Sequence, residues 1–565
     1  MKLTGAEIII KTLIDEGVTD IFGYPGGQVI HIYDALYKYR NEIRHILTAH
    51  EQGAAHAADG YSRATGKVGV CFATSGPGAT NLVTGIATAM LDSIPLVAIT
   101  GNVPCSLIGK DSFQEIDITG VTLPITKHNY FVSDVSELEN AIREAFSIAK
   151  SGRPGPVLVD VPKDVQMATY EFTEKGVSPK IPLPKAKENE ILEAVRLVNE
   201  ARRPYIYIGG GAAGLGLGEE IIAFAEKIDA CIGCSFMGLS AIPNGCERFL
   251  GMQGMHGHYA SSMAQNEADL IIGIGVRFSD RATGNVAKFA KNSKIIQLDP
   301  DFAEINKNVR VDLGIVADVL DAFRRIASAA DASAKPEWNA EFHRLKEKEN
   351  EIEAKIAACS TSSLSPRMVL EVINECKPAG TVIATDVGQH QMWTAQYAEF
   401  DRPRRIVSSG GLGTMGFGLG AAIGARVATG DTTVLVTGDG SFGMNLNELA
   451  TAVSHNIPVI IVLMNNGVLG MVRQWQTLFF GGRYSETVLS DRKTDFVRLA
   501  EAFGARGTRV FTKDELYKAF KDALAANTTV VIDAVIDKDE FVLPMLPPGG
   551  SIDDIITSVS KEETK

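Results

Sequence analysis

The chain has few of the features that mark membrane proteins or nucleic-acid-binding proteins. None of its 565 residues lies in an uncharged apolar run approaching the roughly 18 residues of a membrane span. It has no block of Lys or Arg, and its formal net charge is −13. An acidic chain without basic blocks is a poor binder of nucleic acid or of anionic membranes. We therefore expect neither partner and no membrane span, although a local site can still bind small anions.

Cysteine is also scarce. The seven cysteines are scattered and odd in number, which does not suit a disulfide framework. Cys231 and Cys234 form one C-x-x-C spacing, but the second pair that a zinc site needs is missing. The segment 1–7 leads into an amphipathic helix without a signal or transit pattern. We expect buried, reduced thiols and a cytoplasmic protein.

Glycine, in contrast, is abundant and follows short apolar runs. Of the 55 glycines, several stand directly after the runs 68–74, 204–208 and 433–437. A buried strand, a glycine turn and a helix pattern form the repeating unit of parallel sheets. Because this unit occurs in all three thirds of the chain, we predict an α/β fold with three domains, each a mostly parallel sheet flanked by helices.

Two stretches interrupt this repeating unit. Residues 171–190 are rich in Pro, Lys and Glu and read as an exposed linker. Residues 328–366 contain a charged, helix-like segment at 345–355 and end in a Ser/Thr-rich run. The predicted domains are therefore 1–170, 190–328 and 366–545, followed by a charged tail at 546–565.

The strongest local signal lies in the last third. Gly438-Asp439-Gly440-Ser441 closes an apolar strand, a helix pattern covers 445–455, and a second apolar run ends in Asn465-Asn466-Gly467. A right-handed strand–helix–strand crossover brings both strand ends to one edge of a sheet, where ligands bind. Asp439 and Asn466 would converge there. One carboxylate and one amide oxygen suit Mg²⁺, which takes its remaining oxygens from water and phosphate.

Alone, each of these motifs is also typical of a tight turn or a helix N-cap. Together they resemble the motif of thiamine-diphosphate enzymes, which begins Gly-Asp-Gly and ends Asn-Asn. That resemblance implies thiamine diphosphate as cofactor. It also implies that Asp439, Asn466 and the backbone carbonyl of Val468 bind Mg²⁺.

A second candidate is Glu51, which follows the strand-like segment 43–47 and starts a helix pattern. A carboxylate in the first turn is ordinarily a partner of the helix dipole. The thiamine family uses one Glu, contributed by the partner subunit, to hydrogen-bond the aminopyrimidine ring and promote deprotonation of the thiazolium carbon. The matching residue is Glu51. The turn 74–81 resembles the cofactor-facing turn of a pyrimidine-binding domain, so the first and last domains resemble two related halves.

Further segments resemble the catalytic subunit of acetohydroxyacid synthases (acetolactate synthases) along nearly the whole chain. They are 22–27, 99–104, 111–115, 125–130, 254–257, 276–281, 386–393, 411–416 and 469–475. The resemblance implies a transferase that decarboxylates pyruvate and condenses the hydroxyethyl unit with a second 2-oxoacid, pyruvate or 2-oxobutyrate. The products, 2-acetolactate or 2-aceto-2-hydroxybutyrate, begin branched-chain amino acid biosynthesis. It also implies a homodimer or homotetramer with active sites between subunits and a regulatory small subunit.

The resemblance also assigns residues. The predicted thiamine-diphosphate contacts are Glu51, Gly388, Gln389, His390, Gly413, Met415, Gly440, Ser441, Gly470 and Met471. Met415 would wedge between the two cofactor rings. The predicted substrate contacts are Phe113, Gln114, Lys127, Arg281, Met471 and Trp475. Among these, Arg281 would hold the acceptor carboxylate, and Trp475 would favour 2-oxobutyrate.

The middle domain carries the glycine pattern Gly209-x-Gly211-x-x-Gly214 after a strand, without an acid at the end of the next strand near Cys231–Cys234. We therefore do not expect dinucleotide binding in the Rossmann manner. The resemblance nevertheless implies FAD here, without a redox role. The predicted contacts are Arg153, Gly209, Gly210, Gly211, His256, Gly257, Arg277, Asp280, Arg281, Asp299 and Asp318.

Two other functions stay open at this point. One is another thiamine-dependent 2-oxoacid decarboxylase, such as pyruvate oxidase or a flavin-free catabolic acetolactate synthase. A bound flavin that does not change its redox state would distinguish them. The other is a non-catalytic relative that only binds nucleotide, against which the joint presence of Glu51, Asp439 and Asn466 argues.

Overall fold

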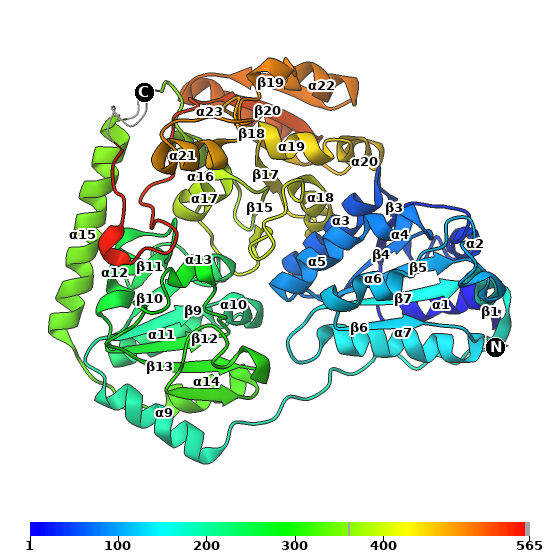
Figure 1. The fold of residues 1–565 in the computed structure, drawn as a ribbon, viewed down its shortest axis with the longest axis horizontal. Coiled ribbons are helices and arrows are strands. Elements are labelled where there is room, and N and C mark those ends of the chain that lie inside the picture. Colours follow the sequence, from blue (N-terminus) through cyan, green and yellow to red (C-terminus); the bar gives the residue numbers. More distant parts are fainter. Residues whose placement is uncertain (360–361, 560–565) are drawn as a thin grey trace.

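Three parallel six-stranded sheets, each flanked by helices, form the three lobes of the molecule in Figure 1. The computed structural model describes residues 1–359 and 362–559. Parts of the predicted second break (360–361) and tail (560–565) lie outside the described residues. The predicted α/β class is confirmed. Within the described ranges, no helix is long and apolar enough to cross a membrane.

The first and last lobes have the same topology. The N-terminal sheet has the order β3-β2-β4-β5-β7-β6, and the C-terminal sheet has the order β16-β15-β17-β18-β20-β19. The N-terminal strands are β2 (Asp20–Gly23), β3 (Arg44–Leu47), β4 (Gly69–Ala73), β5 (Leu96–Asn102), β6 (His128–Phe131) and β7 (Pro156–Pro162). The C-terminal strands are β15 (Val382–Thr385), β16 (Ile406–Val407), β17 (Thr433–Gly438), β18 (Ile460–Asn465), β19 (Arg506–Val510) and β20 (Val530–Val535). Numbered within its own lobe, each sheet reads 2-1-3-4-6-5, as expected of related halves.

The middle sheet differs. Its order is β11-β10-β9-β12-β13-β14, which is 3-2-1-4-5-6 within the lobe, the order of dinucleotide-binding sheets. Its strands are β9 (Pro204–Ile208), β10 (Cys231–Cys234), β11 (Phe249–Met252), β12 (Leu270–Ile274), β13 (Lys294–Asp299) and β14 (Leu313–Val316). The strand order reverses between β9 and β12, beside the turn 209–211. The expectation that this lobe does not bind a dinucleotide in the Rossmann manner rests on the missing acid after β10 and stays a prediction. An acid, Asp299, ends β13 instead.

Helices cover the faces of each sheet. In the N-terminal lobe they are α1 (Gly5–Asp15), α2 (Ile30–Lys38), α3 (Glu51–Thr65), α4 (Pro77–Asn81), α5 (Val83–Asp92), α6 (Ile118–Thr122), α7 (Val135–Lys150) and α8 (Lys163–Met167). In the middle lobe they are α9 (Glu188–Glu200), α10 (Gly210–Leu215), α11 (Gly218–Ile228), α12 (Tyr259–Glu267), α13 (Asp280–Thr283) and α14 (Val319–Ala329). In the C-terminal lobe they are α16 (Pro366–Cys376), α17 (Gln389–Tyr397), α18 (Gly418–Thr429), α19 (Asp439–Asn445), α20 (Glu448–Ser454), α21 (Gly470–Phe479), α22 (Phe496–Ala502) and α23 (Lys513–Ala526). A small antiparallel pair, β1 (Lys2–Thr4) with β8 (Thr169–Glu171), closes the first lobe.

Three local expectations differ from the structure. The helix predicted over 445–455 corresponds to α20, and an additional helix, α19, begins directly at Asp439. The second break is largely helical: α15 (Pro336–Cys359) has 24 residues and runs along the middle lobe. Residues 546–559 pack on the middle lobe instead of projecting as a tail, with the Leu546 N–H donating to the Met255 carbonyl at 2.7 Å.

The first and last lobes meet through α3 and α18, which share one apolar core. Small residues allow these two helices to approach closely. A side chain added at Gly424 would collide with the backbone of Ala57, and one added at Gly60 would collide with the backbone of Ala421. The close crossing couples the helix that carries Glu51 to the C-terminal sheet.

Substituting one of these glycines should therefore destabilise the protein. We expect Gly424→Ala to lower the free energy of unfolding by about 1–3 kcal/mol, the usual cost of overpacking a tight contact. Gly443→Ala is the matched control: Gly443 lies in α19, is exposed and has no neighbour within 4 Å of the added carbon. Urea denaturation of both variants measures the difference, and equal midpoints would contradict the tight crossing.

Candidate active site

The two predicted metal ligands stand at neighbouring strand ends in the C-terminal lobe. Asp439 follows β17 as the first residue of α19, and Asn466 follows β18. The two strands pair in parallel, with Gly438 opposite Met464, so both side chains emerge at the same edge. Burial raises the pKa of Asp439 to about 6, against the opposing effect of backbone N–H groups that include that of Gly467. A cation beside this buried carboxyl would favour its charged form.

Next to Asn466 lies a network of amide side chains. The Asn466 amide donates to Gln389 Oε1 at 3.4 Å. Gln389 in turn donates to Gln474 Oε1 and to the Glu540 carbonyl, both at 2.9 Å. Gly470 leaves the space for this arrangement, because a Cβ there would overlap the Gln389 amide and lie 2.7 Å from Asn466 Nδ2. The structure thus brings together three predicted cofactor or metal residues, Gln389, Asn466 and Gly470. Gln474 was not predicted.

His390 occupies the same edge. Its ring packs over Gly438, where an added Cβ would lie 2.9 Å from Nδ1. Burial lowers the pKa of His390 to about 3, so the ring is neutral. Its Nε2 is buried and lacks a hydrogen-bond partner among the residues that the structure describes. A buried polar atom without a partner fits a bound ligand at that position. Gly388, which is also a predicted cofactor contact, directly precedes α17, the helix that carries His390.

The predicted cofactor wedge, Met415, lies close to Gly440. A Cβ at Gly440 would lie 3.8 Å from the Met415 methyl carbon. Asp386 holds the loop of Met415 and Gly413 to the end of β15, since its carboxylate accepts from the Gly416 N–H at 2.7 Å. Asp386 is buried, and burial raises its pKa to about 6. Asp386 is not among the predicted site residues, although it is the first residue of the segment 386–393. Ser441 is buried as the third residue of α19.

Glu51 starts α3, as predicted, and is buried. Its carboxylate accepts from the Asn81 side-chain amide at 3.0 Å, and Oε1 lies 3.1 Å from where a Cβ on Gly78 would be. Glu51 therefore faces the turn 74–81. Among the described residues, none of its hydrogen bonds reaches Asp439 or Asn466.

The predicted substrate residues Met471 and Trp475 share a cavity of about 680 Å³. The rest of its lining comes from Val472, Gln476, Phe480, Arg483 and Ser485. Trp475 stacks edge-on against Phe479, with ring centroids 5.7 Å apart. Its indole Nε1 is buried without a partner in the described part of the chain. A mostly apolar cavity with an unpaired donor has the features of a binding site for a small molecule.

Three other predicted substrate residues come from the N-terminal lobe. Phe113 is 84% exposed. Gln114 lies over Gly76, where an added Cβ would be 2.9 Å from its Cα. Lys127 turns inward: its Nζ donates to the carbonyls of Ile148 at 2.5 Å and Ser151 at 2.6 Å. Burial lowers the pKa of Lys127 to about 8. A role for Lys127 at the substrate entrance stays a prediction.

Several predicted flavin residues gather at the carboxyl edge of the middle sheet. Arg153 donates to Glu304 at 2.5 Å and to Ser93 at 2.7 Å. Burial and the nearby charge of Arg153 lower the pKa of Arg277. Asp299 is buried, and burial raises its pKa to about 6. Arg153 and Arg277 are two like charges close together and partly buried. An anionic ligand would fit between them, because it would offset their repulsion.

The remaining flavin candidates lie in several places. Gly209 and Gly211 pack against Gly275 at the strand reversal, and Gly210 lies beside Met237. The ring of His256 is buried, and its Nε2 has no hydrogen-bond partner among the described residues. His256 and Gly257 lie in a turn in which the Met255 N–H donates to the Arg281 carbonyl. The side chains of Asp280 and Arg281 are exposed. Asp318 instead caps α14 by accepting from the Leu320 N–H at 2.9 Å and lines a groove of about 520 Å³ between α9 and α14.

Comparisons with known proteins cover the entire chain. Profiles of the thiamine pyrophosphate enzyme family match in three parts: the N-terminal TPP binding domain over residues 3–121, the central domain over 191–326 and the C-terminal TPP binding domain over 386–534. A probable acetolactate synthase large subunit of Methanocaldococcus jannaschii is 45% identical, over 99% of this chain and 96% of its own. The acetolactate synthase large subunit of Haemophilus influenzae is 42% identical over 100% of both chains. The isozyme 3 large subunit of Escherichia coli is 41% identical over 98% of both chains.

These matches agree with the geometry of the site. The residues of the thiamine motif lie at one sheet edge, and the same topology recurs in the two lobes that match the two TPP binding domains. The family resemblance in the sequence is confirmed. The chain belongs to the acetolactate synthase large subunits, within the family of thiamine pyrophosphate enzymes.

Proposed function

We propose that this protein catalyses acetolactate synthesis: it decarboxylates pyruvate and joins the two-carbon unit to a second 2-oxoacid. With pyruvate as acceptor the product is 2-acetolactate, and with 2-oxobutyrate it is 2-aceto-2-hydroxybutyrate. The observation that carries the proposal is the convergence of Asp439, Asn466 and Gln389 beside the cavity that contains Met471 and Trp475. Thiamine diphosphate, when bound, supplies the electron sink that decarboxylation requires.

Each group of residues has a proposed task in this reaction. Asp439, Asn466 and the Val468 carbonyl hold Mg²⁺, and the buried His390 ring and the amide network of Gln389 hold the diphosphate. Gly413, Gly440, Ser441 and Met415 shape the cradle for the cofactor rings. Met471 and Trp475 exclude water from the substrate and contact the acceptor. Phe113, Gln114 and Lys127 belong to the entrance.

Glu51 has the task of holding a proton at a ring nitrogen of the cofactor. Glu51 faces the turn 74–81 of its own chain. Among the described residues, it has no hydrogen bond to the proposed metal ligands Asp439 and Asn466. We propose that Glu51 of one chain meets the Asp439 site of a second chain, which makes a homodimer the smallest active unit. A homotetramer and a regulatory small subunit are compatible with this arrangement.

We also propose FAD in the middle lobe. The support is the buried Nε2 of His256, which has no hydrogen-bond partner among the described residues, the adjacent Arg153 and Arg277, and the strand reversal at Gly209–Gly211. The proposed domain roles are pyrimidine binding for 1–170, FAD binding for 190–328 and diphosphate and Mg²⁺ binding for 366–545. The six described free thiols support a reducing, cytoplasmic environment.

One assay tests the proposed reaction. The purified protein is incubated with pyruvate, thiamine diphosphate and Mg²⁺, and acetolactate is measured while the flavin spectrum is recorded. We expect acetolactate and a flavin that stays oxidised. Flavin reduction with acetate or acetyl phosphate as product would favour an oxidase, and activity without flavin would favour a catabolic acetolactate synthase.

Trp475 provides a prediction about specificity. We expect Trp475→Leu to make acetolactate from pyruvate but to lose preference for 2-oxobutyrate by roughly 10-fold, because contact with one methyl contributes about 1–3 kcal/mol. Competition between the two oxoacids measures the ratio of products. An unchanged ratio would remove Trp475 from the acceptor pocket.

Arg281 is expected to behave differently. Arg281→Gln should lower formation of both products, because a charge-assisted hydrogen bond to the acceptor carboxylate is lost. Release of CO₂ in a single turnover should stay largely intact. Loss of that CO₂ release would place Arg281 in the first half of the reaction or in flavin anchoring.

A further inference from the structure

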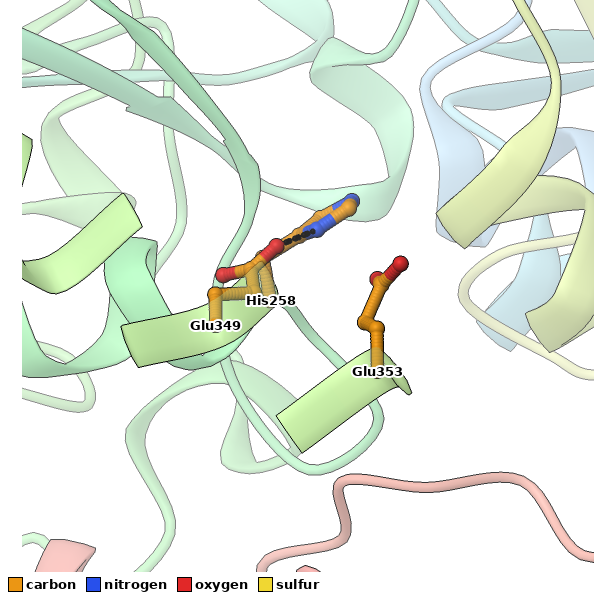
Figure 2. Close-up of side chains that lie close together, drawn as sticks. All are labelled: His258, Glu349 and Glu353. Carbon is orange, nitrogen blue, oxygen red and sulfur yellow. Dashed lines mark hydrogen bonds and ion pairs between the residues drawn. The ribbon is translucent and has the colours of Figure 1, made fainter. Parts of the chain in front are cut away.

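A cluster of ionisable side chains lies on α15, outside the proposed catalytic centre. Glu349 and Glu353, one turn apart on α15, lie beside His258, the residue that precedes α12 (Figure 2). One ligand-type atom from each side chain lies within 4.8 Å of the others. The side chains of His258 and Glu349 are only 18% and 14% exposed, so their charges interact through little water.

His258 is hydrogen-bonded to α15 through its ring nitrogen Nδ1. Its Nδ1 lies 2.6 Å from Glu349 Oε1. The second oxygen of Glu349 accepts from the Ala260 N–H at 2.6 Å. An ionised carboxylate only accepts, so the bond to Glu349 requires His258 Nδ1 to carry hydrogen. Although burial lowers it, the Glu349 carboxylate raises the pKa of His258 above its usual value.

The cluster does not resemble an unfilled cation site. His258 offsets the charge of Glu349, and Arg367 from α16 pairs with Glu353 at 3.0 Å. Because Nδ1 of His258 carries the proton of the bond to Glu349, that nitrogen has no lone pair for a metal ion. The other charged or titratable groups that face the cluster are Lys346 on α15 and Tyr397 on α17.

The pair connects three parts of the molecule. The His258 N–H donates to the Met252 carbonyl at 2.7 Å and ends the turn 254–257. Within that turn, the His256 carbonyl accepts from the Gln396 side chain at 3.0 Å. Gln396 is on α17, the helix that begins with Gln389 and His390. The middle lobe, α15 and the cofactor-binding helix of the C-terminal lobe therefore meet at His258.

We propose that the His258–Glu349 pair is a positioning clasp that fixes the turn 254–257, and with it the ring of His256, against α17. The identity of the ligand that His256 meets rests on the proposed function, which assigns FAD to this lobe. The clasp itself does not touch that ligand. His258 and Glu349 are positioning residues that act through the turn.

The charge of the pair makes the clasp depend on pH. The pKa of Glu349 is lowered, since His258 and the Ala260 N–H outweigh the effect of burial. A raised His258 pKa contributes stability that is present at low pH and lost as pH rises through the folded value. The lowered Glu349 pKa contributes stability that is lost as pH falls through its own folded value. The His258–Glu349 ion pair is therefore intact at pH values between the folded pKa of Glu349 and the folded pKa of His258.

Three variants and one control test the proposal in the full-length protein. His258→Ala and Glu349→Ala break the clasp. Glu349→Gln preserves it without charge, because the amide oxygen can accept from the Ala260 N–H while the amide nitrogen donates to a neutral His258 Nδ1. Glu351→Ala is the matched control: Glu351 is exposed on the same helix and pairs with Lys348, so it removes the same charge away from the turn.

The first measurement is amide hydrogen exchange over residues 252–262, corrected for the intrinsic effect of pH. We expect both clasp-breaking variants to exchange about 10-fold faster there, which corresponds to about 1.4 kcal/mol, and Glu349→Gln and Glu351→Ala to resemble the parent protein. The parent should lose protection as pH rises above the folded pKa of His258, and Glu349→Gln should not. Unchanged exchange in both clasp-breaking variants, or the same loss of protection in Glu351→Ala, would overturn the proposal.

The second measurement is the affinity for FAD. We expect the dissociation constant to rise about 10-fold in the two clasp-breaking variants and to be restored in Glu349→Gln. If the parent protein binds no FAD, the flavin assignment fails while the exchange data still decide the clasp. Titration with Zn²⁺ completes the test: tight binding that Glu353→Ala abolishes would overturn the clasp in favour of a metal site.

Discussion

Replacing Glu51 by Gln should lower turnover by at least about 100-fold, the lower end of the contribution of a positioned acid–base group. The substitution preserves the size of the side chain and its position at the start of α3. It removes the carboxylate that would hold a proton at the cofactor ring, whereas the Asn81 amide, now 3.0 Å from a carboxylate oxygen, can still donate to an amide oxygen. The expected loss is therefore in kcat, with the fold and the affinity for thiamine diphosphate retained.

The measurement is acetolactate formation at saturating thiamine diphosphate and Mg²⁺. Glu137→Gln is the matched control, because Glu137 is an exposed carboxylate in the first turn of α7 in the same lobe. It should leave turnover within a factor of about two, as surface substitutions usually do. Turnover of Glu51→Gln near that of the parent protein would remove Glu51 from the chemistry.

The second large effect is expected at the metal site. Asp439→Ala removes the one charged group among the three proposed Mg²⁺ ligands and leaves Asn466 and a backbone carbonyl to face a dication beside a diphosphate. We expect the affinity for thiamine diphosphate in Mg²⁺ to fall by about 100-fold or more, since even residues that only support a metal ligand contribute about 10- to 100-fold. The FAD that we propose for the middle lobe should stay bound.

Calorimetric titration of thiamine diphosphate in Mg²⁺ measures this loss, and flavin absorbance reports the middle lobe in the same sample. Asp514→Ala is the control, since Asp514 is an exposed acid at the start of α23 in the same lobe. If Asp439→Ala binds the cofactor as the parent does, the proposed metal site is wrong. Loss of the flavin together with thiamine diphosphate would instead indicate general unfolding.

The convergence of Asp439 and Asn466 could be predicted from the sequence because it depends on chain direction alone. Two apolar runs separated by a helix form parallel neighbours, and parallel neighbours end at one edge. The start of α3 at Glu51 is equally local. The amide network around Gln389 could not be predicted in this way, since its partners Gln474 and the Glu540 carbonyl come from segments far along the chain.

Lys127 and Asp386 show the same limit for single side chains. Their residue types allow many partners, and packing selects which carbonyl or N–H group is within reach. Lys127 bonds to carbonyls at the end of α7. Asp386 holds the Gly416 loop. His258 meets Glu349, 91 residues away in the sequence, because α15 runs along the middle lobe.

The sequence by itself determined the α/β class, the three domains and the family, because apolar periodicity, glycine turns and motif spacing are properties of neighbouring residues. Only the tertiary structure decided that the middle sheet has the strand order 3-2-1-4-5-6 while the outer two share another. It also decided which buried charges face one another. The physical reason is that strand order and charge pairing depend on contacts between distant segments, and those contacts form only when the separate apolar faces pack into common cores.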